Sequence, residues 1–138
     1  REARETHAVG RALTPEQTAI ANFWECNPYT LHVQGHTMFA TKKLSPGGHW
    51  VGIAGLAARR ANADAMRAAA VYARVSVALA DGFISAWDEK FRSNVPRPET
   101  VINKYVDPAW EPLLQTPPFP EYPSGHSVIS PAAAAVLE

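Results

Sequence analysis

The longest regular pattern of apolar and polar positions runs from Ala63 to Arg92 and is free of proline and, except for Gly82, of glycine. Charged residues recur every seven positions and mark a solvated stripe: Arg60, Arg67, Arg74, Asp81 and Asp88. Apolar residues recur at spacings of three and four, the period of one helix face: Met66, Ala69, Ala73, Val77, Ala80, Ile84, Trp87 and Phe91. The pattern predicts one long helix, capped by Asn62, with the apolar stripe buried.

Further helices are predicted before the long one. Thr14-Pro15-Glu16-Gln17 has the form of a capping box with proline at the first helical position, which predicts a helix from Pro15 to Trp24. Ser45-Pro46 can begin another helix that runs to about Arg60. The segment from Thr30 to Lys43 is also predicted as a helix, and it carries His32 and His36 at a spacing able to chelate a metal, although no acidic or thiol partner is evident.

The second half of the chain begins with a proline-rich loop. Eight prolines lie between Asn94 and Pro123, so we expect an ordered loop with one short helix near Val101 to Tyr105. The run from Ser127 to Leu137 favours a final helix that either starts at Pro131 or kinks there. Because no strand-like alternation is sustained, the predicted fold class is all-α, a helical bundle centred on the long helix.

Composition narrows the class of protein. A hydrophobic content of 46% with 19% charged residues excludes disorder, and a net charge of zero argues against a nucleic-acid partner. No run approaches the roughly 20 apolar residues of a membrane span, so none is expected. The single Cys26 rules out an internal disulfide framework. Alternating charges at the start indicate a solvated leader over residues 1–12, followed by a helical domain over 13–138.

The stretch Phe-Pro-Glu-Tyr-Pro-Ser-Gly-His, residues 119–126, carries the strongest chemical signal. Ser124 supplies a hydroxyl, and Gly125 lets a ligand approach the backbone amide with no side chain in the way. His126 can carry a proton near neutral pH. Since a helix is predicted to follow, these residues would lie at a helix N-terminus, where anions bind.

A second cationic motif lies upstream, at Lys90 and Arg97-Pro98. Lys90 is two residues past Asp88, roughly 200° around the helix, so it points away from the charged stripe and needs an anionic partner. Arg97 lies between two prolines, which makes its backbone a stiff mount for a guanidinium group. Each residue alone has an ordinary reading: Lys90 as a snorkelling lysine and Ser124 as a helix cap.

Lys-x6-Arg-Pro followed by Pro-Ser-Gly-His resembles the first two of three signature motifs of the vanadium haloperoxidase and type 2 phosphatidic-acid phosphatase superfamily. The flanking residues are similar to its soluble bacterial haloperoxidase-like branch. The resemblance implies that Lys90, Arg97, the Ser124 hydroxyl and the Gly125 amide hold the oxygens of vanadate or phosphate, and that His126 serves as acid and base and lies at the same site. It also implies that Trp87 and Phe119 line a halide pocket.

The third motif, Ser-Arg-x5-His-x3-Asp, does not occur in these 138 residues, so no histidine here can be the axial metal ligand or the phosphohistidine nucleophile. We therefore expect the N-terminal part of such a domain, inactive alone. Its exposed apolar surface would be covered by the C-terminal part of the domain or by a homo-oligomer partner.

The first functional expectation is a vanadium-dependent haloperoxidase-like enzyme that oxidises halide with hydrogen peroxide. The alternatives are a soluble acid phosphatase that hydrolyses phosphomonoesters and a non-catalytic oxyanion-binding helical fragment. The resemblance implies a periplasmic or secreted location.

Overall fold

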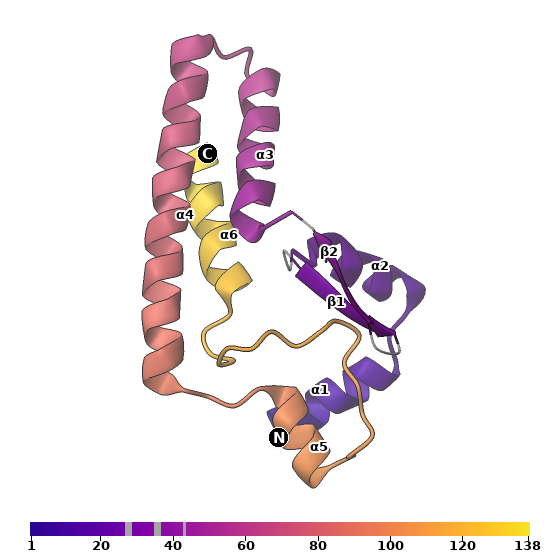
Figure 1. Ribbon diagram of the computed structural model, residues 1–138. Coiled ribbons are helices and arrows are strands. Elements are labelled where there is room, and N and C mark those ends of the chain that lie inside the picture. The colour runs from indigo at the N-terminus through magenta and orange to yellow at the C-terminus, as the bar shows by residue number, and fades with distance from the viewer. Residues whose placement is uncertain (27–28, 35–36, 43) are drawn as a thin grey trace.

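The computed structural model describes residues 1–26, 29–34, 37–42 and 44–138. The elements follow one another along the chain as α1 (Glu2–Arg11), α2 (Pro15–Trp24), β1 (Tyr29–Gln34), β2 (Thr37–Lys42), α3 (Pro46–Arg60), α4 (Ala65–Ser93), α5 (Pro98–Tyr105) and α6 (Gly125–Leu137). Helices dominate the described residues, which confirms the predicted helical class (Figure 1).

The helix caps explain most of the helix boundaries. The capping box at Thr14 is present, with its hydroxyl accepting from the Gln17 amide at 3.1 Å and the Gln17 side chain accepting from the Thr14 amide at 2.9 Å. Ser45 caps α3 in the same way, by accepting from the Gly48 amide at 3.2 Å. Both predicted helix starts are therefore confirmed.

The predicted cap of the long helix was wrong. Asp64, not Asn62, begins α4, because its carboxylate accepts from the Arg67 amide at 2.8 Å. Asn62 instead adopts a left-handed backbone conformation, with φ of 49°, in the turn between α3 and α4. Asparagine tolerates this region better than most residues with a side chain, so it suits the turn.

The helix predicted from Thr30 to Lys43 was also wrong. Strands β1 and β2 pair there as an antiparallel two-stranded sheet, with His32 opposite Phe39 and Gln34 opposite Thr37. Aromatic and β-branched residues are frequent in both strands, and they favour extended backbone over helix. His36, one of the two histidines at chelating spacing, lies outside the described residues.

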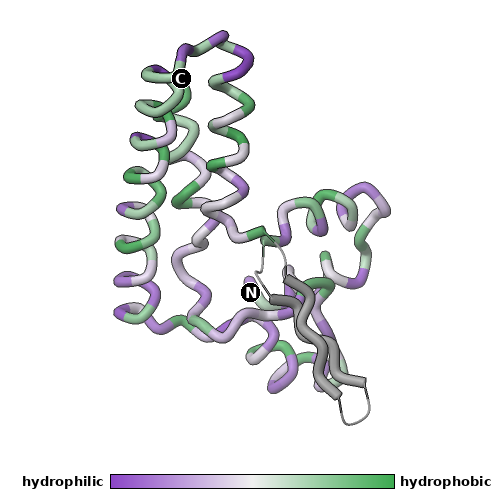
Figure 2. The backbone as a smooth tube through the Cα atoms, turned by 45° about the horizontal axis from the view of Figure 1, so that its top comes forward, coloured by the Kyte–Doolittle hydropathy of each residue, from purple (hydrophilic) through white to green (hydrophobic). Residues whose placement is uncertain are grey.

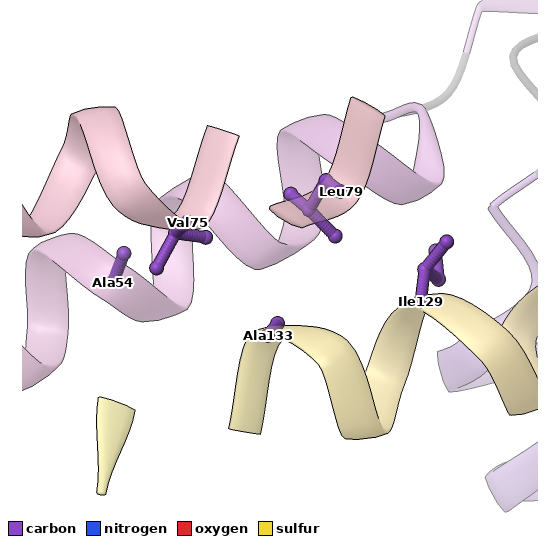
Figure 3. Close-up of a cluster of buried hydrophobic side chains, with 5 residues drawn as sticks. All are labelled: Ala54, Val75, Leu79, Ile129 and Ala133. Atoms are coloured by element: carbon purple, nitrogen blue, oxygen red, sulfur yellow. The ribbon is translucent and has the colours of Figure 1, made fainter. Parts of the chain in front are cut away.

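The main core lies where α4 packs against α3 and α6 (Figure 1). Five buried residues form it, and Figure 3 shows their side chains: Ala54, Val75, Leu79, Ile129 and Ala133. Alanine on α3 and α6 leaves room for the larger side chains of α4. Pro131 lies inside α6, which begins at Gly125, so the helix does not start late at the proline.

The long helix buries a different face from the one that the sequence pattern predicted. Its buried residues are Val75, Leu79, Ala86 and Lys90, whereas most of the predicted apolar stripe is exposed. Figure 2 shows hydrophobic segments recurring along α4. The helix has apolar residues on both faces, and which face is buried depends on where α3 and α6 pack, which the periodicity of α4 alone does not contain. By length and mean hydropathy alone, one helical stretch, Ala65–Tyr105, could cross a membrane, and 11% of its most apolar window is buried. A single match of this kind is weak evidence for a membrane span.

The residues predicted as a solvated leader form α1, which packs on α5. The Asp107 carboxylate, just past α5, lies 3.2 Å from His7 Nε2 and accepts from Arg11 Nη1 at 3.2 Å. The His7 hydrogen bond is the main cause that lowers the pKa of Asp107 below its ordinary value of 3.8. The charged carboxylate therefore fastens α1 to the helical domain.

We expect Asp107→Asn to release α1. Because the folded-state pKa of Asp107 is depressed, its contribution to stability is present above 3.8 and is lost as the pH falls through the lower folded value. Hydrogen exchange of the α1 amides measures this when it is expressed as protection factors, which remove the intrinsic pH dependence of exchange: protection should fall in the wild type on acidification, and in Asp107→Asn at neutral pH. Glu111→Gln, an exposed neighbour, should leave it unchanged. Unchanged protection of α1 in Asp107→Asn would contradict this role.

Candidate active site

Three ends of helices meet at one cavity of about 1160 Å³. Lys90 comes from the last turn of α4, Arg97 is the N-cap residue of α5, and Ser124 is the N-cap residue of α6. All the residues predicted for the anion and halide sites line this cavity: Trp87, Lys90, Arg97, Phe119, Ser124, Gly125 and His126. The fold thus brings the Ser-Gly-His turn to Lys90 and Arg97, which lie 34 and 27 residues before Ser124 in the sequence.

Lys90 is the largest of the side chains that are fully buried, at 1% exposed. Its ammonium donates to the carbonyl oxygens of Pro120 at 2.9 Å and Glu121 at 3.0 Å. Burial lowers the pKa of Lys90 below 10.5, the Arg97 charge lowers it further, and Glu121 partly offsets both. A buried lysine with a lowered pKa gains from any anion placed beside it.

Arg97 is held from two sides at once. Its Nε donates to the Phe119 carbonyl at 2.6 Å, and its Nη1 donates to the Glu121 carboxylate at 2.7 Å. The backbone of Arg97 is extended, with φ of −64° and ψ of 144°, as expected for the residue before Pro98. The described hydrogen bonds of both cations therefore go to residues 119–121, directly before the Ser-Gly-His turn, because buried cations need acceptors.

Phe119 lies among the charged groups and Trp87. Its ring centroid is 5.1 Å from Lys90 Nζ, 4.7 Å from Arg97 Cζ and 5.0 Å from the Trp87 ring. Both cations lie at distances typical of cation–π contacts, so the ring helps to hold them near one another. The halide-pocket residues predicted from the resemblance thus form one aromatic wall beside the two cations.

The first turn of α6 completes the cavity wall. The Ser124 hydroxyl accepts from the Ser127 amide at 3.3 Å, so the capping role is present. The first amides of a helix, here those of Gly125 and His126, have no acceptor within the helix and are available to an anion. A Cβ on Gly125 would lie 3.2 Å from Cζ3 of Trp87, so glycine lets the turn approach the indole ring. The exposed His126 also lines the cavity.

Glu121 is the residue of this site that the sequence reasoning did not single out. Its carboxylate bonds Arg97, and its carbonyl accepts from Lys90. The signal was an acidic residue three positions before Ser124, next to two cations expected to converge. Within the described residues, no group of three or more His, Cys, Asp or Glu side chains could hold a metal ion.

Comparisons with known proteins identify the family of the chain. Residues 103–138 match the family model of the VCPO second helical-bundle domain. The whole chain, to 99%, is similar to a solved structure described as the first bacterial vanadium-dependent iodoperoxidase, with 51% identity and a TM-score of 0.86. The chain belongs to the vanadium haloperoxidase superfamily. It spans 32% of the length of that iodoperoxidase chain, and no curated protein sequence matches it.

Proposed function

We propose that this chain provides part of the oxyanion site of a vanadium-dependent haloperoxidase, with iodide as the halide. The observation that carries the proposal is the meeting of the two cations Lys90 and Arg97 with the N-terminus of α6 beside an aromatic wall. The similarity to an iodoperoxidase supports the choice of halide.

The donor set fits an oxyanion such as vanadate. Lys90 and Arg97 would offset its negative charge, while the Ser124 hydroxyl and the Gly125 amide would donate to its oxygens. When bound, vanadate supplies the activation of hydrogen peroxide for transfer of an oxygen atom to halide. The histidine of the third motif, which the resemblance makes a vanadate ligand, is not among these residues.

Two parts of the chain would then shape the reaction. His126 would accept the proton of hydrogen peroxide on its imidazole and later return a proton. Trp87 and Phe119 would exclude water from the halide side, where a poorly hydrated anion is more reactive.

A phosphatase is the second candidate, because the same donors fit the oxygens of a phosphate ester equally well. The similarity to an iodoperoxidase favours the halide reaction, for which the Trp87–Phe119 wall offers an apolar surface that would remove water from the halide. The two functions are tested on a chain extended through the third motif. A haloperoxidase should need vanadate to convert iodide to triiodide and lose activity in phosphate buffer. Phosphomonoester turnover without vanadate-dependent iodide oxidation would overturn the first choice.

Trp87→Ala should separate the two functions further. We expect it to reduce the iodide oxidation of the extended chain while changing phosphate affinity much less, because the oxyanion donors remain. Trp87 packs on Phe83 with ring centroids 5.3 Å apart, so the loss of stability must be measured as well. Leu79→Ala, which removes a buried core side chain of the same helix that does not line the cavity, is the matched control for the loss of stability. Equal losses of iodide oxidation in the two variants would contradict a halide role for Trp87.

A further inference from the structure

Glu121 places a negative charge inside the cationic site itself. Its side chain lines the same cavity as Lys90 and Arg97 and is 40% exposed. The carboxylate accepts from Arg97 Nη1 at 2.7 Å, so one anion already lies on the guanidinium group that would bind the oxyanion. An acidic residue in this place lowers the positive potential that attracts any oxyanion, so its presence needs a reason other than attraction.

Hydrogen bonds of the backbone fix Glu121 in this position. The Glu121 amide donates to the Val95 carbonyl at 2.9 Å, and the Glu121 carbonyl accepts from Lys90 Nζ at 3.0 Å. Val95 lies in the link between α4 and α5, two residues before Arg97. Glu121 is therefore bonded to both segments that carry the cations, which fixes the position of its charge relative to theirs.

Arg97 can bind a second anion beside Glu121. In the described hydrogen bonds, its Nε donates to the Phe119 carbonyl and its Nη1 donates to the Glu121 carboxylate. The guanidinium group carries further N–H donors on its two terminal nitrogens. An oxyanion held by these would share one guanidinium with Glu121. The two anions would then lie closer together than the Debye length of about 8 Å, so salt would screen their repulsion only in part.

The charge of Glu121 also acts on Lys90. Burial and the Arg97 charge lower the pKa of Lys90, and the Glu121 charge raises it. The two cations and the carboxylate are thus close enough to influence one another. An anion that enters the site is attracted by both cations and repelled by Glu121 at the same time.

The strength of that repulsion depends on the charge of the oxyanion. Coulomb energy is proportional to the product of the charges, so a dianion is repelled about twice as strongly as a monoanion in the same position. In dilute neutral solution vanadate is mainly a monoanion, phosphate is divided between monoanion and dianion, and molybdate is a dianion. A carboxylate on Arg97 therefore lowers the affinity for dianions more than the affinity for vanadate.

We propose that Glu121 is a specificity-determining residue of the oxyanion site, whose carboxylate on Arg97 selects monoanionic vanadate over dianionic oxyanions of similar shape. This inference rests on the proposed function and adds to it the charge state of the anion that the site prefers. Because phosphate is partly a dianion, the same carboxylate weakens the competition of phosphate with vanadate.

Calorimetric titration with vanadate and with molybdate, two oxyanions of similar size, tests the selection on the chain extended through the third motif. Glu121→Gln keeps an oxygen acceptor for Arg97 and removes the charge. We expect the affinity for vanadate to rise about threefold and that for molybdate about tenfold, because the gain for a dianion is roughly the square of the gain for a monoanion. Glu111→Gln, at an exposed glutamate that does not line the cavity, should leave the ratio of the two affinities unchanged.

Glu121→Asp separates selection by charge from a role in orienting Arg97. Aspartate keeps the charge but is one methylene shorter, which loosens the hydrogen bond to Arg97. We expect Glu121→Asp to keep the wild-type preference for vanadate, and Glu121→Gln to lose part of it. Vanadate binding with the same ratio of affinities in Glu121→Gln and the wild type would overturn this inference alone. A wild type that binds neither anion would overturn the proposed oxyanion site, and this inference with it.

Discussion

Replacing His126 by alanine is expected to lower iodide oxidation by roughly 10²–10⁴-fold in a chain extended through the third motif, which is the usual contribution of general acid–base catalysis. His126 lies in the first turn of α6, next to the amides that would hold the oxyanion, and lines the same cavity as Lys90 and Arg97. Its loss removes the proton acceptor and leaves both cations in place.

Turnover and anion affinity should therefore respond differently to His126→Ala. Steady-state kinetics should show the loss mainly in kcat, while titration with vanadate shows little change in affinity. A variant that loses vanadate affinity in proportion to activity would indicate a binding role. Full retention of turnover would remove His126 from the reaction.

Lys90→Met is expected to weaken both the fold and the anion site. The methionine fills a similar volume, but the buried carbonyls of Pro120 and Glu121 lose their donor, which costs about 1–3 kcal/mol in the free energy of unfolding. Vanadate and phosphate affinity should fall because one of the two cations is gone. Lys104→Met, at an exposed lysine on α5, is the matched control for chemical denaturation and for anion titration.

The pH dependence of stability and of anion affinity should identify the contribution of Lys90 more specifically. Its folded-state pKa lies below 10.5, so the unfolded chain binds more protons between the two values, and this group makes stability rise with pH in that window. Anion affinity should fall as the pH rises through the same window, because the lysine loses its charge. Both effects should be absent from Lys90→Met. An unchanged pH profile in the variant would contradict a buried, titrating Lys90.

Local signals in the sequence were sufficient for most of the helices. The capping box at Thr14 and the Ser45-Pro46 pair act through neighbouring residues alone, and the structure has both helix starts where they were predicted. Around residues 30–43 the helical prediction failed, because strand pairing depends on a partner segment that local propensity does not contain. The prediction of the buried face of α4 failed for a related reason. Which stripe becomes core depends on where α3 and α6 pack, and both stripes of α4 are apolar in the sequence.

The candidate site was more predictable than the fold around it. The spacing of Lys90 and Arg97 and the Ser-Gly-His turn identified residues that the structure brings to one cavity. Glu121 could not be assigned, because its contact with Arg97 arises only when the loop before α6 folds back over the end of α4. The contact of α1 with Asp107 could not be predicted from the sequence either, because His7 and Asp107 are 100 positions apart.

The central claim is that Lys90, Arg97 and the first turn of α6 form one oxyanion site, and calorimetric titration of the 138-residue chain with vanadate tests it most directly. We expect binding of one vanadate per chain that phosphate displaces, and a loss of about tenfold in affinity in Arg97→Lys, because a planar fork of donors becomes a point charge. Arg92→Lys, at an exposed arginine of α4, is the control variant and should bind vanadate as the wild type does. Absence of binding, or equal affinity in Arg97→Lys and the wild type, would contradict the account.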